Sequence, residues 1–350
     1  MTEKDLFSFA REYGISDNRA TDTGIGVSPI GPSRRVKTTI RKAVKEIGVS
    51  PDPLQTRLRG LLVSKYGVRN ESLSFGNSLE ELLYRITRVL APKKVLVAGP
   101  SPDIHGMAAS SSGGEVSRLQ AVRDADLSPD TDAVIAHLGG IDMLIMANPN
   151  RITGRLIPQG EIDRLLQEAE RKGAFVVLDE SLAEFAGRGD VFGCPGDAAI
   201  VLRTTAFFYG LAGLELAYAA SSPAVAEKLS TASCGQVNHL AVEACRAALR
   251  DKTYQKQAGG FVQAEKLFFS RECAKIPGVR MYASESNVFI LHLPEAEDRV
   301  RAALCRAGFL VRDCEGEEGP GRSFLRVSVM SHESNCKFMR IVKENLPSRP

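Results

Sequence analysis

The feature that most constrains the fold of this chain is a series of short apolar runs separated by segments with helical spacing. The runs cover residues 94–98, 143–147, 175–178, 199–202 and 217–220. Between two of them, residues 161–172 repeat apolar side chains at the three- and four-residue spacing of a helix. Short buried strands that alternate with helices are typical of βαβ units. The pattern therefore predicts an α/β fold with a mostly parallel sheet covered on both faces.

The flanking segments predict two units and an arm. Apolar spacing predicts helices at 34–47, 54–66 and 79–90, and mostly helical structure over 223–275. From about residue 277 the pattern changes to strand 288–293, helix 296–307, strand 324–329 and helix 332–346. We therefore expect an extended N-terminal arm (1–34), a large domain (35–250) and a small α+β domain (251–350). The arm should lie against the small domain or a partner subunit.

Composition excludes several classes of protein. The 350 residues carry 45 Lys and Arg against 42 Asp and Glu, so a net charge of +3 argues against a nucleic-acid partner. No apolar stretch approaches 18 residues, and residues 1–5 are charged, so neither a membrane partner nor a secretory signal is expected. The seven cysteines are irregularly spaced, which favours free thiols and a cytoplasmic location. The isolated histidines predict no metal site.

Ligands of open α/β sheets bind at the carboxyl ends of the strands. Polar or glycine-containing segments follow three of the predicted strands, at residues 148–154, 179–182 and 203–214. Taken singly, each segment is as compatible with a helix cap or an ordinary turn as with a binding site.

The order and spacing of six motifs resemble the fold-type-I, pyridoxal-phosphate-dependent aminotransferases, in the branch of histidinol-phosphate aminotransferase and threonine-phosphate decarboxylase. The segments are S-P-I-G-P-S (28–33), F-G-N-S-L-E-E-L (75–82), N-P-N-R-I-T-G (148–154), D-E-S-L (179–182), the run 203–218 and F-L-R-V-S (324–328). The resemblance spans roughly residues 25–345. It implies a large domain with a seven-stranded, mostly parallel sheet and a small α+β domain.

Several positions depart from the family pattern. The lysine that forms the Schiff base with the cofactor matches Phe207, which has no amine. The arginine that binds the cofactor phosphate matches Glu215, which reverses the charge. The two partners of the ring hydroxyl match Arg151 and Leu182, and the stacking aromatic ring matches Pro102. The resemblance thus implies no catalytic residue at the lysine position.

Other positions are retained. Asp179 matches the aspartate that pairs with the pyridine nitrogen, and Thr204 matches a phosphate-contacting hydroxyl. Asn77 and Ser78 lie in the phosphate turn, so these four residues are the residual candidates for cofactor contacts. Arg326 matches the arginine that grips the substrate carboxylate, and Arg151 is the second substrate-binding candidate. Asp179 is equally compatible with a helix cap, and Thr204 with a turn.

At about 1–3 kcal/mol for each charge-assisted bond, the lost contacts remove most of the affinity for the family cofactor. We therefore expect no bound cofactor and a catalytically degenerate aminotransferase homologue that acts as a binding, scaffold or regulatory protein. One alternative is an enzyme that uses the remodelled pocket for other chemistry, with or without loosely bound pyridoxal or pyridoxamine phosphate. Another is a conventional amino-acid aminotransferase or decarboxylase.

The expected partners are a second copy of the chain in a homodimer, an active relative in a heteromer, and a carboxylate-bearing small molecule. Within the emptied site, unpaired buried charges would be costly. We therefore expect Phe207 to point into the ring site and Arg151 to pair with Asp179 or Glu215. Glu215 is expected within reach of Arg151 or Arg203.

Overall fold

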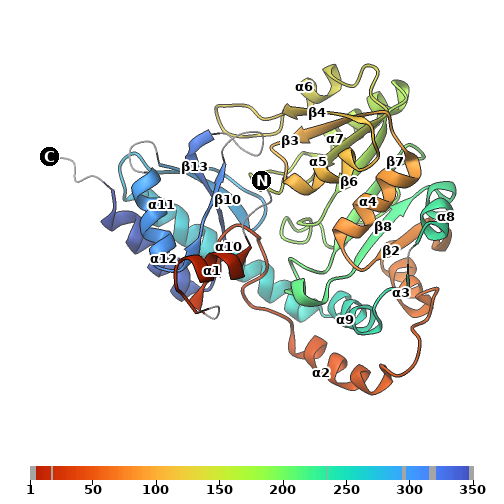
Figure 1. Ribbon diagram of the computed structural model, residues 1–350, viewed down its shortest axis with the longest axis horizontal. Coiled ribbons are helices and arrows are strands. Elements are labelled where there is room, and N and C mark those ends of the chain that lie inside the picture. The colour runs from red at the N-terminus through yellow and green to blue at the C-terminus, as the bar shows by residue number, and fades with distance from the viewer. Residues whose placement is uncertain (1–4, 17–18, 234, 294–296, 315–320, 347–350) are drawn as a thin grey trace.

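A seven-stranded sheet lies at the centre of the computed structural model, which describes residues 5–16, 19–233, 235–293, 297–314 and 321–346 (Figure 1). The strand order is β2-β8-β7-β6-β5-β3-β4, and within this sheet only β8 is antiparallel to the others. The predicted α/β fold is confirmed. The strands are β2 (Leu73–Gly76), β3 (Lys94–Gly99), β4 (Glu115–Gln120), β5 (Met143–Ala147), β6 (Phe175–Asp179), β7 (Ala199–Thr204) and β8 (Ala217–Ser221).

Helices cover both faces of this sheet. Strand β5 is buried along its whole length, and its alternate side chains point to opposite faces. Met143 and Ile145 pack on one side with α4 (Leu79–Leu90), α5 (Asp103–Ser110) and α8 (Pro223–Thr231). Leu144 and Met146 belong to the apolar core on the other side, with α6 (Thr131–Ala136) and α7 (Gln159–Arg171). Burial on both faces explains the continuous apolar runs in the sequence.

A second, antiparallel sheet forms beside the first from the C-terminal part of the chain (Figure 1). Its order is β12-β13-β10-β9, with β9 (Arg280–Met281), β10 (Val288–His292), β12 (Arg312–Cys314) and β13 (Gly321–Ser328). It is accompanied by α10 (Lys252–Ala274), α11 (Glu297–Arg306) and α12 (His332–Glu344). Helices α2 (Arg34–Ala43), α3 (Thr56–Tyr66) and α9 (His239–Leu249) lie at the opposite end of the molecule. The boundaries at residues 34 and 250 remain a prediction.

The N-terminal arm differs from the extended segment that we expected. Helix α1 (Leu6–Glu12) begins at Asp5, whose side chain accepts a hydrogen bond from the amide of Ser8. Phe9 is buried in a small cluster with Cys305 and Leu310, and this packing stabilises a helix too short to persist alone. Strand β1 (Thr21–Asp22) then pairs in parallel with β11 (Phe309–Leu310), so the expected contact with the C-terminal unit is confirmed.

Two strands of the large sheet were missed by the apolar-run criterion. Strand β4 lies at the edge of the sheet, and its sequence E-V-S-R-L-Q alternates exposed polar and partly buried side chains. Strand β2 is only four residues long. The helix expected over 34–47 ends at Ala43 and continues as one 3₁₀ turn (Val44–Glu46). None of the helices that the structure describes combines the length and apolar character needed to cross a bilayer.

A buried carboxyl group lies beneath the segment that follows β6. Glu184 is almost fully buried, and neither of its oxygens has a hydrogen-bond partner among the described residues. The nearby guanidinium of Arg203 is instead held by Glu180, with an Nη2–Oε2 distance of 2.8 Å. Burial raises the pKa of Glu184 despite the opposing charge of Arg203. Glu184 therefore favours its protonated form in the folded protein.

This predicts that Glu184→Gln stabilises the protein at alkaline pH. Because the folded-state pKa is raised, stability is fully present below the ordinary glutamate pKa and is lost as pH rises above it. Each unit of the shift corresponds to about 1.4 kcal/mol. Denaturant titrations at pH 4.5 and pH 8 should show a gain for the variant at pH 8 only. An equal destabilisation at both values would show that Glu184 is ionised in the folded protein.

Candidate ligand-binding site

The carboxylate of Asp179, the last residue of β6, is the centre of the candidate site. It is fully buried, and its Oδ2 lies 3.0 Å from His105 Nε2. Its Oδ1 accepts a hydrogen bond of 2.8 Å from the Ser181 amide. Burial acts to raise the pKa of Asp179, but the hydrogen bond from His105 and the charge of Arg151 outweigh it and lower the pKa to about 2. Asp179 is therefore ionised.

His105 extends this contact to a third side chain. Since an ionised carboxylate can only accept, Nε2 of His105 carries the hydrogen that faces Asp179. The other ring nitrogen, Nδ1, lies 2.8 Å from the hydroxyl oxygen of Ser101. His105 is on α5, one helical turn after Ser101, which places both on one face. The sequence interpretation missed both residues; the spacing S-x-x-x-H after a strand was the available signal.

Arg151 and Phe207 meet above this carboxylate. Arg151 Nη1 lies 3.6 Å from Asp179 Oδ2, which confirms the expected pairing of these two residues. The guanidinium carbon of Arg151 also lies 4.8 Å from the centroid of the Phe207 ring. Phe207 is only 7% exposed. The position that resembles the Schiff-base lysine thus holds a buried ring stacked under a cation.

The other end of the site is organised by Glu215, and here the expectation was wrong. Glu215 pairs with neither Arg151 nor Arg203. Its Oε1 accepts hydrogen bonds from the Leu79 amide at 2.9 Å and from the Thr204 hydroxyl at 2.6 Å. Leu79 is the first residue of α4, where unpaired amides and the helix dipole favour a negative charge. The helix end, rather than an arginine, neutralises the carboxylate.

The remaining predicted residues have other contacts. Ser78 caps α4 through a hydrogen bond from the Glu81 amide, at 3.0 Å. The side-chain oxygen of Asn77 accepts a hydrogen bond of 2.9 Å from the amide of Asn238. Arg326 is buried on β13 in the second sheet, opposite Ile290 of β10. The structure therefore brings together Asp179, Arg151 and Phe207 at one end, and Thr204 and Glu215 with the start of α4 at the other.

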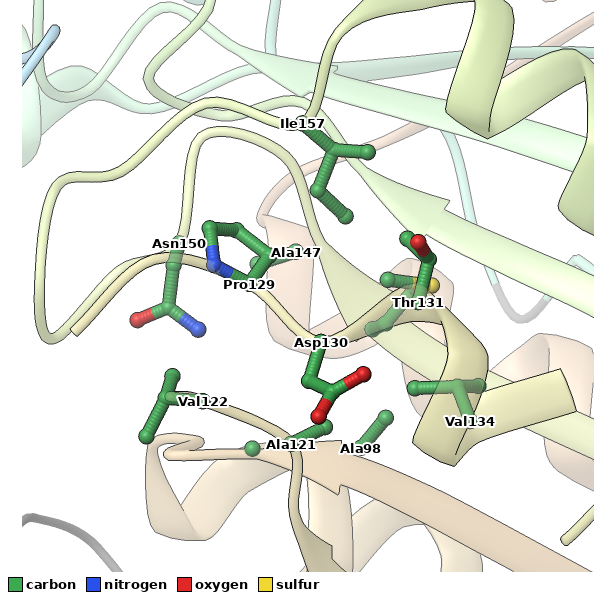
Figure 2. A pocket seen from close by; sticks show the side chains of 12 residues that line it. Ala98, Ala121, Val122, Pro129, Asp130, Thr131, Val134, Ala147, Asn150 and Ile157 are labelled. Carbon is green, nitrogen blue, oxygen red and sulfur yellow. The ribbon is translucent and has the colours of Figure 1, made fainter. Parts of the chain in front are cut away.

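A small pocket opens at the same edge of the large sheet (Figure 2). Its volume is about 20 Å³, which is room for a water molecule but not for a substrate. The polar groups in its wall are already paired. Asn150 donates to the Pro100 carbonyl at 2.8 Å, and Asp130 accepts a hydrogen bond from the Ala133 amide at 3.0 Å. This pocket therefore belongs to the supporting structure.

Two features do not fit pyridoxal phosphate held as the resemblance implies. Phe207 has no amine for a covalent link. The carboxylate of Glu215 occupies the hydrogen-bond donors of Leu79 and Thr204 that a phosphate group would need. Asp179, in contrast, has the charge required to pair with a pyridinium nitrogen. The residues fit the ring nitrogen of the cofactor but neither its covalent attachment nor its phosphate.

Known proteins similar to this chain come from the expected branch. The histidinol-phosphate aminotransferase of Stutzerimonas stutzeri is 28% identical, over 98% of this chain and 93% of its own length. A putative threonine-phosphate decarboxylase of Caldanaerobacter subterraneus is also 28% identical, over 91% and 88%. The crystal structure of Sinorhizobium meliloti histidinol-phosphate aminotransferase has a TM-score of 0.88 at 21% identity, over 97% and 95% of the two chains. The fold-type-I expectation is thereby confirmed.

The same comparison corrects the expectation that no cofactor binds. The Sinorhizobium meliloti structure is a complex with pyridoxal 5'-phosphate. Our expectation counted only contacts whose residues are replaced, namely those at Phe207 and Glu215. It gave no weight to what remains, which the structure places at the edge of the sheet: an ionised Asp179, the Thr204 hydroxyl and the N-terminus of α4. Missing contacts alone were an insufficient basis for excluding the family cofactor.

Asp179 should contribute measurably to stability at neutral pH. Its folded-state pKa of about 2 lies below the ordinary aspartate value of about 3.9, so the contribution is present above the latter and is lost as pH falls through the former. The shift corresponds to about 2 kcal/mol. In denaturant titrations, Asp179→Asn should lower the free energy of unfolding by at least this amount at pH 7, with a smaller deficit near pH 2. Asp124→Asn, at an exposed position, is the control and should have little effect. A deficit of the same size at both pH values would contradict the prediction.

The fold, the motifs and the retained edge of the sheet agree with one family description. Residues 24–342, nearly the whole chain, match the aminotransferase class I and II family. This chain belongs to the aminotransferase class I and II family.

Proposed function

We propose that this chain is a catalytically degenerate aminotransferase homologue that acts as a binding, scaffold or regulatory protein. The observation that carries the proposal is the contact between Phe207 and Arg151. An internal aldehyde acceptor requires an amine at this position. A phenyl ring offers none, and its stacking under a guanidinium that also pairs with Asp179 leaves the position filled by compatible side chains.

The ligand that suits this site is a carboxylate-bearing small molecule. Arg151 has one face on the Phe207 ring and lies 3.6 Å from Asp179, which leaves guanidinium hydrogens free of ideal hydrogen bonds to this carboxylate. Its side chain is 18% exposed, so it is reachable from outside. At the other end, Glu215 repels a second anionic group. The proposal therefore assigns Arg151 the main role, with Arg326 as a second carboxylate contact, and Asn77, Ser78 and Thr204 as residual cofactor contacts.

One alternative is supported by a specific observation. The chain Ser101–His105–Asp179 joins a hydroxyl, an imidazole and an ionised carboxylate in hydrogen-bond reach of each other. Such a chain can move a proton between its ends, which suits an enzyme with non-transaminase chemistry. The names of the relatives support a third candidate, a conventional aminotransferase acting on histidinol phosphate.

Exchange of the α-proton of amino acids in deuterated water separates these candidates. With pyridoxal phosphate and histidinol phosphate or an amino acid added, the purified protein should give no exchange above the cofactor alone. Phe207→Lys should not create this exchange, because Glu215 still occupies the Leu79 and Thr204 donors; adding Glu215→Arg tests that reason. Exchange by the unaltered protein would overturn the proposal in favour of the conventional enzyme.

Calorimetric titration with a panel of mono- and dicarboxylates tests the binding role. Arg151→Gln should weaken binding about tenfold or more, because charge-assisted hydrogen bonds contribute about 1.5–3 kcal/mol. Arg164→Gln, which removes an exposed guanidinium paired with Asp132, is the matched control and should leave the affinity unchanged. Equal affinities for all three proteins would exclude Arg151 from the site.

A homodimer, or a heteromer with an active relative, is part of the proposal. It is supported by consecutive exposed apolar side chains after α2, with Ile47 at 65% and Val49 at 72% exposure. Sedimentation at micromolar concentration should give twice 37.9 kDa for the chain alone. Ile47→Asp with Val49→Asp should give the monomer mass. A monomer without these substitutions would contradict the homodimer. The unpaired cysteines of the described residues support a cytoplasmic location for this assembly.

A further inference from the structure

A second cluster of reactive side chains lies away from the candidate site, on α10 and α12. Cys336 Sγ lies 3.5 Å from His332 Nε2, and the other ring nitrogen of His332 lies 3.0 Å from Glu265 Oε1. Cys336 and His332 are one turn apart on α12 and therefore share a face. Glu265 comes from α10, 67 residues earlier in the chain. The three side chains form the sequence thiol, imidazole, carboxylate.

The carboxylate end of this cluster is held firmly. Glu265 is 6% exposed, and its Oε2 accepts a hydrogen bond of 2.8 Å from the side chain of Asn335. Asn335 is fully buried and also binds the backbone of Met330 through both side-chain atoms. Because Nδ1 of His332 faces this carboxylate, it carries the ring hydrogen, and Nε2 presents its lone pair to the thiol of Cys336.

The thiol end is open to solvent. Cys336 is exposed, and the His332 side chain is 63% exposed. By contrast, four other described cysteines are buried, and burial raises the pKa of Cys273 to about 12. Cys194 is partly exposed, but its thiol donates to the Gly196 carbonyl. Among the described cysteines, Cys336 is thus the one that combines access with a neighbouring base. Arg340, one turn further along α12, is exposed and adds a positive charge near the sulfur.

We propose that Cys336 is a nucleophilic thiol that forms reversible mixed disulfides with low-molecular-weight, negatively charged disulfides of the glutathione disulfide type. His332 Nε2 accepts the thiol proton, and the Cys336 sulfur attacks one sulfur of the disulfide. The sulfur–sulfur bond of the reagent breaks, a bond between Cys336 and one half of the reagent forms, and the other half leaves as a thiolate that takes up the proton. Glu265 is a positioning residue, since it acts only by orienting His332.

The test is the rate of mixed-disulfide formation in the full-length protein with glutathione disulfide at pH 7. Intact mass gives the extent, and peptide mapping separates Cys336 from Cys194, which serves as the internal reference. Cys336 should react at least tenfold faster than Cys194, and Cys336→Ser should abolish the fast phase. His332→Gln should slow Cys336 about tenfold and leave Cys194 unchanged.

Two further variants keep the result interpretable. Glu265→Gln should slow Cys336 in the same direction as His332→Gln, with circular dichroism to check the fold because Glu265 is buried. His137→Gln, at an exposed histidine on the other side of the chain's sequence, should have no effect. A Cys336 rate equal to that of Cys194, or one insensitive to His332→Gln in the folded protein, would show that the cluster only joins the two helices.

Discussion

The buried charge of Asp179 is the constraint on which the arrangement of the site depends. A carboxylate without solvent is costly unless opposite charge and hydrogen bonds surround it. Here the surrounding groups come from three loops that follow parallel strands: His105 after β3, Arg151 after β5 and Ser181 after β6. Parallel strands deliver their carboxyl ends to one edge of the sheet, so residues far apart in sequence can meet at one charge.

The same principle accounts for the other end of the site. The N-terminus of α4 carries unpaired amides and a partial positive charge, which make it a place for an anion. In this chain the anion is the side chain of Glu215, shared with the hydroxyl of Thr204. The structure thus preserves the electrostatic preference of the family site and meets it with a group of the chain itself. This is why Phe207 and Glu215, which look disruptive as single substitutions, are compatible with a well-packed edge.

Prediction from the sequence succeeded where burial is uniform and failed where it is mixed. Strands β5, β6 and β7 are buried on both faces, and their apolar runs were read correctly. The edge strand β4 and the four-residue β2 gave no such run. Helix α1 was missed because Phe9 is stabilised by Leu310 and Cys305, about 300 residues away. Local patterns cannot report a contact whose two sides are so distant.

The sequence by itself determined the family architecture and the substitutions that matter, because motif order and residue type at Phe207, Arg151 and Glu215 are local facts. Only the tertiary structure decided what those residues do. It paired Glu215 with the end of α4 instead of an arginine, and added His105 and Ser101 to the environment of Asp179. It also brought Glu265 to His332 and Cys336. The physical reason is that hydrogen bonds and ion pairs act over about 3–4 Å, and only folding sets which distant groups come that close.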